Sequence, residues 1–379
     1  MFSAEDYAMM ARALQLAERG RGIATPNPHV GCVIVKQGRI IGEGFTQLGG
    51  RPHAEAEALA ACRESPHGAT VYSTLEPCAV HAKARGPACS DLLIAARVRR
   101  VVSALHDPFH GVNGAGHERL RADGIELDIG LMAAQTREQL KAFLHRVERG
   151  RPWLTLKVAA TLDGKTALAN GESQWITGAE ARRDVHRLRA EACAVMTGIG
   201  TALIDDPALT VRDWVPPSSP NATVQRQPLR ILLDSRLEVR DGMKLLKGGN
   251  TLIATCAADS ARAQALRDQG VTLMAVAAEA IKGKVDLAAM MSQLGSYEGR
   301  GINHILVEAG ARLSASLLLA GVVDEIVFYL APSLFGDSAR GLFALPELTN
   351  LQDRIALQIS DVRHVGMDLR ITAQLQNKS

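Results

Sequence analysis

The sequence predicts two α/β domains in tandem. Its 379 residues exceed one typical domain. A hydrophobic content of 47% with 22% charged residues is sufficient for two buried cores, and helix and strand patterns alternate along both halves. The stretch "ERGRP" at residues 148–152 has the composition of a linker. The predicted domains therefore cover residues 1–147 and 148–379.

The first domain has the element order αββαβαβ, which predicts a sheet covered by helices. An amphipathic helix at residues 4–19 precedes the apolar runs "HVGCVIV" and "RIIGEGF", and the two runs predict a hairpin. The other predicted helices lie at residues 53–63, 90–97, 116–122 and 133–147, and the other predicted strands at residues 69–74, 100–105 and 125–129.

The second domain begins at "WLTLKVAATLDGKTA" and repeats the alternation with different lengths, so it is predicted to be a separate α/β domain. Helices are predicted at residues 179–189, 260–268, 286–294 and 313–320, and strands at residues 194–198, 229–234, 251–255, 271–276, 304–310 and 324–330, with two more strands before the end of the chain. Residues 215–228 form a polar, Pro-rich loop.

The composition argues against several classes of protein. A net charge of +3 and an aromatic content of 4% disfavour nucleic-acid binding. The first helix does not have the pattern of a signal peptide, and no run of eighteen apolar residues predicts a membrane span. We therefore expect a cytoplasmic protein, in a reducing compartment where its six cysteines are not a disulfide framework.

One short stretch, "TLEPCAVHAKARGPAC" at residues 74–89, carries two cysteines that admit several interpretations. A disulfide loop, two unrelated thiols, a structural zinc module and a catalytic zinc site are the alternatives. The upstream "HAEAEAL" adds His53 and Glu55 in an H-x-E arrangement. His53, Cys78 and Cys89 supply three zinc ligands and leave the fourth position for water, which is typical of catalytic zinc. Glu55 is then placed to transfer protons.

H-x-E followed by P-C-x-x-C is the signature of zinc nucleobase deaminases. Here the first half is intact, but ten residues separate Cys78 from Cys89 in place of two. The zinc interpretation is favoured because the two half-signatures occur together and in order.

Motifs from both halves resemble one family. "PNPHVGCVIV", "GRPHAEAEAL", "TLEPC" and "LKVAATLDGKTA" followed by "GESQWIT" are similar to the bifunctional deaminase/reductase of riboflavin biosynthesis, over nearly the whole chain. The resemblance implies a cytidine-deaminase-like α/β/α sandwich and a dihydrofolate-reductase-like α/β domain. It also implies Zn²⁺, NADPH and a small phosphoribosyl-pyrimidine substrate. The substrate would lose its 2-amino group as ammonia before its ribose is reduced to a ribityl chain.

For the deaminase half, the resemblance implies that His53, Cys78 and Cys89 bind zinc and that Glu55 is the proton shuttle. The implied substrate contacts are Asn27, Asp107 and the basic loop residues His81, Lys83 and Arg85. Two departures from the family pattern affect these contacts. The loop histidine is displaced by one position, and Phe109-His110 replaces the Asn-Pro that usually follows Asp107-Pro108.

The second half lacks the GxGxxG fingerprint. "MTGIGT" and "VEAGARLSAS" nevertheless predict strand–Gly–helix junctions, where free backbone N–H groups suit phosphate. The resemblance implies that Lys157 and Asp205 lie near the reacting carbon. The implied cofactor contacts are Ala159, Trp175, Thr201, Asp205, Ser235, Gly310, Ala311, Arg312, Leu313, Ser314, Ala315 and Ser316. The implied substrate contacts are Ser173, Arg189, Leu209, Arg212 and Glu308.

Two other functions stay open on the sequence alone. The altered cysteine loop and Phe109 are compatible with a reductase whose deaminase half is degenerate. A nucleic-acid deaminase or RNA-binding module is the other candidate, although charge and aromatic content disfavour it. Families of this kind often assemble, which leaves a homo-oligomer open.

Overall fold

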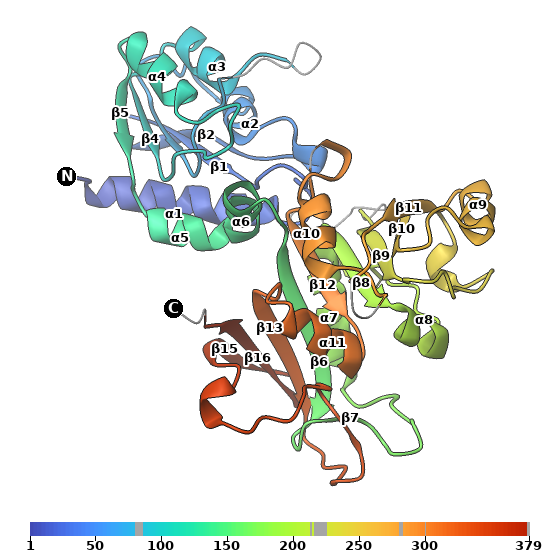
Figure 1. The fold of residues 1–379 in the computed structure, drawn as a ribbon. Helices are drawn as coiled ribbons and strands as arrows, with labels where there is room; N and C mark the ends of the chain where they lie inside the picture. The colour runs from blue at the N-terminus through green and yellow to red at the C-terminus, as the bar shows by residue number, and fades with distance from the viewer. Residues whose placement is uncertain (80–85, 213, 216–225, 280–282, 300, 377–379) are drawn as a thin grey trace. The chain divides into compact units, whose positions relative to one another are not determined.

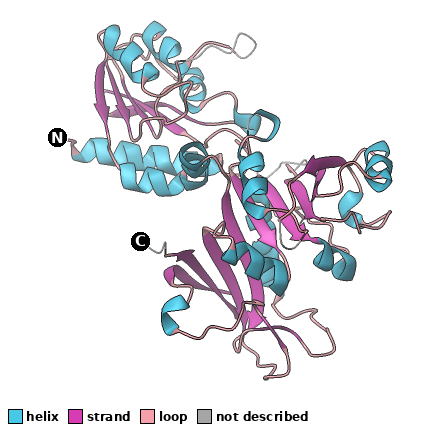
Figure 2. Cartoon of the chain, viewed as in Figure 1, coloured by secondary structure: helices cyan, strands magenta, loops and turns pink. Residues whose placement is uncertain are grey.

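The protein consists of two compact units, seen in a computed structural model that describes residues 1–79, 86–212, 214–215, 226–279, 283–299 and 301–376 (Figure 1). Unit 1 is built mainly from Met1–Gly150, and unit 2 from Arg151–Trp214 and Thr223–Ser379. Helices and strands alternate in each unit (Figure 2). None of the helices in the described part of the chain has the length and apolar character that crossing a bilayer requires.

Unit 1 contains one sheet and six α-helices among its described residues. The strands are β1 (Gly31–Lys36), β2 (Arg39–Phe45), β3 (Thr70–Ser73), β4 (Arg100–Ser103) and β5 (Glu126–Ile129). The helices are α1 (Ala4–Arg19), α2 (Ala54–Ala60), α3 (Cys89–Ala95), α4 (Ala115–Ala122), α5 (Ala133–Gln139) and α6 (Lys141–Arg149), with a 3₁₀ turn η1 (Leu48–Gly50).

The sheet of unit 1 has the strand order β2-β1-β3-β4-β5. β1 pairs antiparallel with β2 and β3, whereas β3, β4 and β5 run parallel. Because side chains alternate across a strand, Ile34 belongs to the same hydrophobic cluster as Ala58 of α2, while Val33 and Val35 belong to that of Met10 in α1. Helices therefore cover both faces of the sheet, which confirms the predicted α/β/α sandwich.

The described residues of unit 2 form a nine-stranded sheet and a small two-stranded one. The strands are β6 (Trp153–Thr161), β7 (Lys165–Ala167), β8 (Ala194–Gly198), β9 (Leu229–Leu233), β10 (Thr251–Thr255), β11 (Thr272–Ala275), β12 (His304–Glu308), β13 (Glu325–Ala331), β14 (Arg340–Gly341), β15 (Leu357–Val365) and β16 (Asp368–Leu375). The helices are α7 (Ala179–Glu191), α8 (Ile199–Asp205), α9 (Ala261–Asp268), α10 (Leu287–Gly295) and α11 (Ala311–Leu319), with 3₁₀ turns η2 (Lys244–Leu246), η3 (Tyr297–Gly299) and η4 (Leu351–Asp353).

The large sheet of unit 2 has the order β11-β10-β9-β8-β12-β6-β13-β16-β15. The strands from β11 to β13 in this order run parallel, and β16 and β15 add an antiparallel margin. The carboxyl ends of parallel strands meet at one edge, where open α/β sheets bind ligands. The predicted second α/β domain is confirmed, and its topology indicates which edge carries a site.

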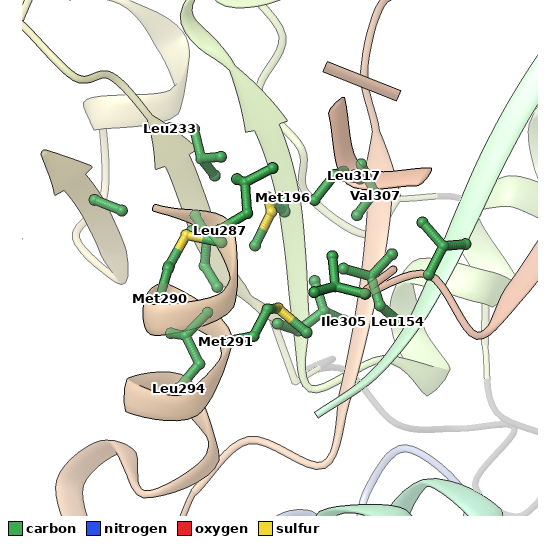
Figure 3. Packing of buried hydrophobic residues seen from close by; sticks show 14 of the residues in the cluster. Leu154, Met196, Leu233, Leu287, Met290, Met291, Leu294, Ile305, Val307 and Leu317 are labelled. Carbon is green, nitrogen blue, oxygen red and sulfur yellow. The ribbon is translucent and has the colours of Figure 1, made fainter. Parts of the chain in front are cut away.

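The main core of unit 2 lies between this sheet and α10 (Figure 3). Met290, Met291 and Leu294 of α10 are fully buried against a sheet surface that includes Met196 of β8 and Ile305 of β12. Burying an aliphatic side chain of this size contributes roughly 1.5–3 kcal/mol. This packing holds β8 and β12, whose carboxyl ends reach the candidate site.

The structure differs from the sequence prediction at short elements. The single helix predicted at residues 133–147 is two helices, because Leu140 departs from helical geometry (φ −96°, ψ 11°) with its side chain fully buried. Neither α8 nor the β7–β14 pair is predicted by the sequence pattern. α8 spans seven residues and buries only Ala202, which is too little for a helical hydrophobic pattern.

Candidate active sites

The three predicted zinc ligands lie where the chain enters helices α2 and α3 or leaves β3. His53 is the N-cap of α2, Cys78 follows β3, and Cys89 is the first residue of α3. α2 lies directly on β2, since a Cβ at Gly44 would be 2.4 Å from the Ala54 carbonyl oxygen. Only glycine allows this approach, which holds the start of α2 against β2.

The ligand atoms of His53, Cys78 and Cys89 lie within 4.8 Å of one another. His53 Nδ1 is 3.5 Å from Cys78 Sγ and 3.3 Å from Cys89 Sγ. Tetrahedral zinc with Zn–N and Zn–S bonds near 2.0 and 2.3 Å separates such atoms by roughly 3.5 Å. Both cysteines are free thiols, so the disulfide interpretation fails. The donor set fits a zinc ion with three protein ligands.

The Cys89 thiol donates a hydrogen bond to Cys78. This bond, with His53 adding to it against the effect of burial, lowers the pKa of Cys78 to about 4. The same bond and burial raise the pKa of Cys89. The Cys89 backbone N–H also points at Cys78 Sγ, at 3.4 Å. A thiolate is the form that binds metal, so the site is electrostatically prepared for a cation.

Glu55 lies in the first turn of α2, two residues after His53, and is only 3% exposed. Burial raises the pKa of its carboxyl. Ser73, the last residue of β3, donates from Oγ to Glu55 Oε1 at 3.0 Å and orients the carboxyl. No sequence motif marks Ser73, because its contact with Glu55 depends on where β3 ends relative to α2.

The structure describes some of the predicted substrate contacts of unit 1, namely Asn27 and Asp107, but not the loop residues. Asn27 donates from Nδ2 to the Gly50 carbonyl at 3.0 Å and so holds the 3₁₀ turn before His53. Asp107 is buried, accepts from the Phe109 N–H at 2.9 Å, and has its pKa raised to about 6 by burial. The loop residues His81, Lys83 and Arg85 lie outside the described residues.

A large cavity of about 2160 Å³ lies at the carboxyl ends of β6, β8, β9 and β12, with all its lining residues in unit 2. The predicted site residues that line it are Lys157, Ala159, Ser173, Trp175, Arg189, Thr201, Asp205, Leu209, Arg212, Ser235, Glu308, Gly310, Ala311, Arg312, Leu313 and Ser316. The structure therefore brings together side chains that are up to 159 positions apart in the chain. Ser314 and Ala315 are buried in α11 and do not line the cavity.

Three charged groups form a network in this cavity. Arg189 of α7 donates from Nε and Nη2 to the two carboxylate oxygens of Glu308, at 2.5 and 3.0 Å. Lys157 Nζ lies 3.8 Å from Glu308 Oε2. Burial opposes ionisation of Glu308, but the two cations lower its pKa to about 2. Burial lowers the pKa of Lys157, and Glu308 counteracts this. The network carries a net positive charge.

Further residues of the same helix as Arg189 line the cavity, and two of them, Arg182 and His186, were not predicted from the sequence. Arg182 and His186 are seven and three positions before Arg189, so the three share one face of α7. The Arg182 guanidinium lies 4.7 Å from the centre of the Trp175 ring. His186 Nδ1 accepts from the Arg212 N–H at 3.1 Å and thereby positions Arg212. The i, i+4, i+7 spacing of Arg182, His186 and Arg189 could have indicated from the sequence that the three share one face of a helix.

Comparison with known proteins defines the class of protein first. Residues 3–105 match the cytidine and deoxycytidylate deaminase zinc-binding region, and residues 152–371 match the RibD C-terminal domain. The chain is thus a two-domain enzyme, a zinc-dependent deaminase joined to an NADPH-dependent reductase.

Relatives that match both halves identify the family. The chain is 46% identical to the riboflavin biosynthesis protein RibD of Escherichia coli (strain K12) over 371 residues, covering 96% of this chain and 98% of that protein. A structure of Acinetobacter baumannii RibD superposes with a TM-score of 0.89 at 37% identity, covering 98% and 99% of the two chains. The chain belongs to the RibD family of bifunctional riboflavin-biosynthesis enzymes.

A further solved structure carries both activities in its name. It is the Thermotoga maritima diaminohydroxyphosphoribosylaminopyrimidine deaminase/5-amino-6-(5-phosphoribosylamino)uracil reductase, with a TM-score of 0.81, 29% identity and coverage of 98% of this chain and 99% of that one. These full-length likenesses confirm the predicted bifunctional enzyme and its cofactors zinc and NADPH. They do not favour the reductase-only alternative.

Proposed function

We propose that unit 1 converts 2,5-diamino-6-(5-phosphoribosylamino)pyrimidin-4-one and water into the corresponding uracil and ammonia. Unit 2 then reduces the ribosylamino group to give 5-amino-6-(5-phosphoribitylamino)uracil. The observation that carries the proposal is the convergence of His53, Cys78 and Cys89 beside the buried Glu55. The cationic cavity of unit 2 supports the second reaction.

In the deamination, His53, Cys78 and Cys89 hold the zinc ion. Zinc, when bound, supplies a Lewis acid that makes water nucleophilic near neutral pH. Glu55 takes a proton from the attacking water and delivers it to the departing amine as the C2–N bond breaks. Its burial favours this exchange, because a carboxyl with a raised pKa gains and loses a proton more readily near neutral pH. Ser73 holds the carboxyl in place.

In the reduction, NADPH when bound supplies the hydride that adds to C1′ of the opened sugar. The N-terminus of α11 offers backbone N–H groups for the cofactor pyrophosphate, and Thr201 Oγ1 accepts from the Gly310 N–H at 3.1 Å and fixes this turn. Ala159, Trp175 and Ser235 extend the cofactor surface along the strand ends.

The substrate is held at the other side of the same cavity. Arg189 and Arg212 bind its 5′-phosphate, and Ser173, Leu209 and Glu308 complete the contact surface. Lys157 and Asp205 are the polar groups closest to the reacting carbon in this proposal. Their main contribution is to orient the imine, because hydride transfer depends on alignment more than on proton transfer.

A coupled assay tests both halves. Glu55→Gln should lose ammonia release yet still oxidise NADPH with substrate that has been deaminated beforehand, and Asp205→Asn should release ammonia without oxidising NADPH. Glu57→Gln, on the same helix but outside the ligand set, is the matched control and should retain both reactions. Ammonia release by Glu55→Gln at the wild-type rate would refute the assignment of the deaminase site.

We also propose that residues 148–152 are the boundary between the two catalytic domains along the chain. We propose further that the enzyme acts in the cytoplasm on this small molecule rather than on nucleic acid or at a membrane, and that it self-associates. The last proposal is supported by the edge strand β15, which exposes Leu357, Ile359 and Val362. Light scattering tests the mass in solution, cell fractionation tests the compartment, and a tRNA deamination assay tests the nucleic-acid alternative.

A further inference from the structure

A second cluster of metal-binding side chains lies in unit 1, separate from the His53–Cys78–Cys89 set. It comprises Glu76, His106 and His117, whose ligand atoms lie within 4.8 Å of one another. Glu76 follows β3, His106 follows β4, and His117 lies in the first turn of α4. Because β3 and β4 are parallel neighbours, their carboxyl ends bring these segments together.

The separations between the atoms suit one shared cation. Glu76 Oε2 is 3.2 Å from His106 Nδ1 and 3.6 Å from His117 Nδ1. A tetrahedral ion with bonds near 2.0–2.1 Å to imidazole and carboxylate separates its ligands by roughly 3.3 Å. Two imidazoles and one carboxylate form a donor set that borderline ions such as Zn²⁺ favour.

His117 supplies an independent observation. Its side chain is 3% exposed, and Nδ1 has no hydrogen-bond partner among the described residues. Its other ring nitrogen, Nε2, lies 3.0 Å from Ser103 Oγ at the end of β4. Metal-binding histidines usually anchor the second ring nitrogen in this way, which leaves the first nitrogen directed at the ion. Here that nitrogen faces a carboxylate, and a shared cation would satisfy both groups.

The Glu76 carboxylate is held rigidly, since it accepts hydrogen bonds from the backbone N–H groups of four residues. The donors are Asp107, Gly114, Gly116 and His117, at 2.9–3.2 Å. These bonds fix the carboxylate but contribute no full positive charge. His106 is about half exposed, at 49%, so the cluster has an opening through which an ion can enter from solvent.

We propose that Glu76, His106 and His117 bind a second divalent transition-metal ion of the Zn²⁺ class. The ion ties residues 106–117, which include Asp107, to the segment that carries Cys78. It is a structural clamp beside the deaminase site and takes no part in the reduction. A direct contact between His106 Nδ1 and Glu76 Oε2, at 3.2 Å without an ion, is the competing arrangement, and the two arrangements differ in measurable metal content.

Zinc content per chain tests the proposal. The full-length protein, equilibrated with micromolar Zn²⁺ and then desalted, should hold two zinc ions. His117→Asn should hold one and His106→Asn should hold one or bind the second at least tenfold more weakly. His110→Asn, an exposed histidine of the same loop, is the matched control and should hold two. A wild-type content of one ion, or two ions in His117→Asn, would overturn the proposal.

A second measurement separates this site from the catalytic one. Cys78→Ser removes a ligand of the first site only, so Zn²⁺ should still raise its melting temperature by several degrees. Adding His117→Asn to that variant should abolish the rise. A cooperative melting transition of the metal-free variants checks that unit 1 is folded, since both changes lie in that unit. Equal responses of the single and double variants would refute a metal at Glu76.

Discussion

Replacing Glu308 by Gln should destabilise unit 2 more than any other single change of one carboxylate to an amide in its cavity. Glu308 and Arg189 are each 13% exposed and joined by two hydrogen bonds, and Lys157 is 17% exposed and 3.8 Å away. Glutamine keeps the shape of the side chain but leaves two buried cations without their counter-charge. Removing one partner of a buried ion pair costs about 3–5 kcal/mol.

Proton linkage gives the same magnitude independently. The pKa of Glu308 falls from 4.5 to about 2 in the folded protein, and each unit corresponds to about 1.4 kcal/mol. Ionised Glu308 therefore contributes about 3 kcal/mol above pH 4.5, and this contribution is lost as the pH falls from 4.5 towards 2. Both routes predict a melting temperature about 10 °C lower for unit 2 at pH 7.

Thermal unfolding at pH 7 measures the effect, with Glu347→Gln as the control because Glu347 is an exposed carboxylate of the same unit. The control should unfold within about 1 °C of the wild type. In Glu308→Gln the loss should shrink towards pH 3, since the carboxyl of the unfolded wild-type chain is protonated below pH 4.5 and the contribution of ionised Glu308 to stability is then partly lost. A loss below 1 kcal/mol at pH 7, or an equal loss in Glu347→Gln, would refute the account of a buried, charge-compensating carboxylate.

Three further changes follow from the same geometry. Cys89→Ser should lose the catalytic zinc and ammonia release while NADPH oxidation with deaminated substrate continues, as metal analysis and the coupled assay would show. Arg212→Met should raise KM for the phosphorylated substrate roughly 10–100-fold with a smaller change in kcat, because a charged hydrogen bond contributes about 1.5–3 kcal/mol; an unchanged KM would remove Arg212 from the phosphate site. Burial lowers the pKa of His29 from 6.5 to about 3, so the unfolded chain binds a proton before the folded chain does as the pH falls. Below pH 6.5 the free energy of unfolding should therefore decrease by up to about 1.4 kcal/mol per pH unit. His29→Gln should show a shallower slope in urea unfolding between pH 7 and 4.5, and an unchanged slope would contradict the assignment.

Much of the fold was predictable because the signal is local. The buried parallel strands of unit 2 are continuous apolar runs, and the helices of unit 1 have caps or apolar periodicity that the sequence displays. The break at Leu140 and the short α8 escaped prediction because neither alters the local pattern. Both depend on which side chains the rest of the unit can bury.

Only those residues of the candidate sites that belong to sequence motifs could be predicted from the sequence. H-x-E and the two cysteines indicate zinc because ligand chemistry is tied to residue type. Ser73, by contrast, reaches Glu55 only because β3 ends beside the start of α2, and His117 faces Glu76 only because β3 and β4 run parallel. Such contacts follow from topology, which a single sequence does not display.

The two chemistries separate cleanly because their reactive groups belong to different compact units. In unit 1, the lowered pKa of Cys78 suits a metal cation, and the raised pKa of the buried Glu55 suits proton transfer. In unit 2, Arg189, Lys157 and Arg212 outweigh Glu308 around one cavity, which suits a phosphate and a pyrophosphate. Hydrolysis of an amidine depends on a metal and a proton shuttle, whereas hydride transfer depends on a site that holds a dinucleotide beside the substrate. The two units therefore match two different reactions of the same phosphorylated compound.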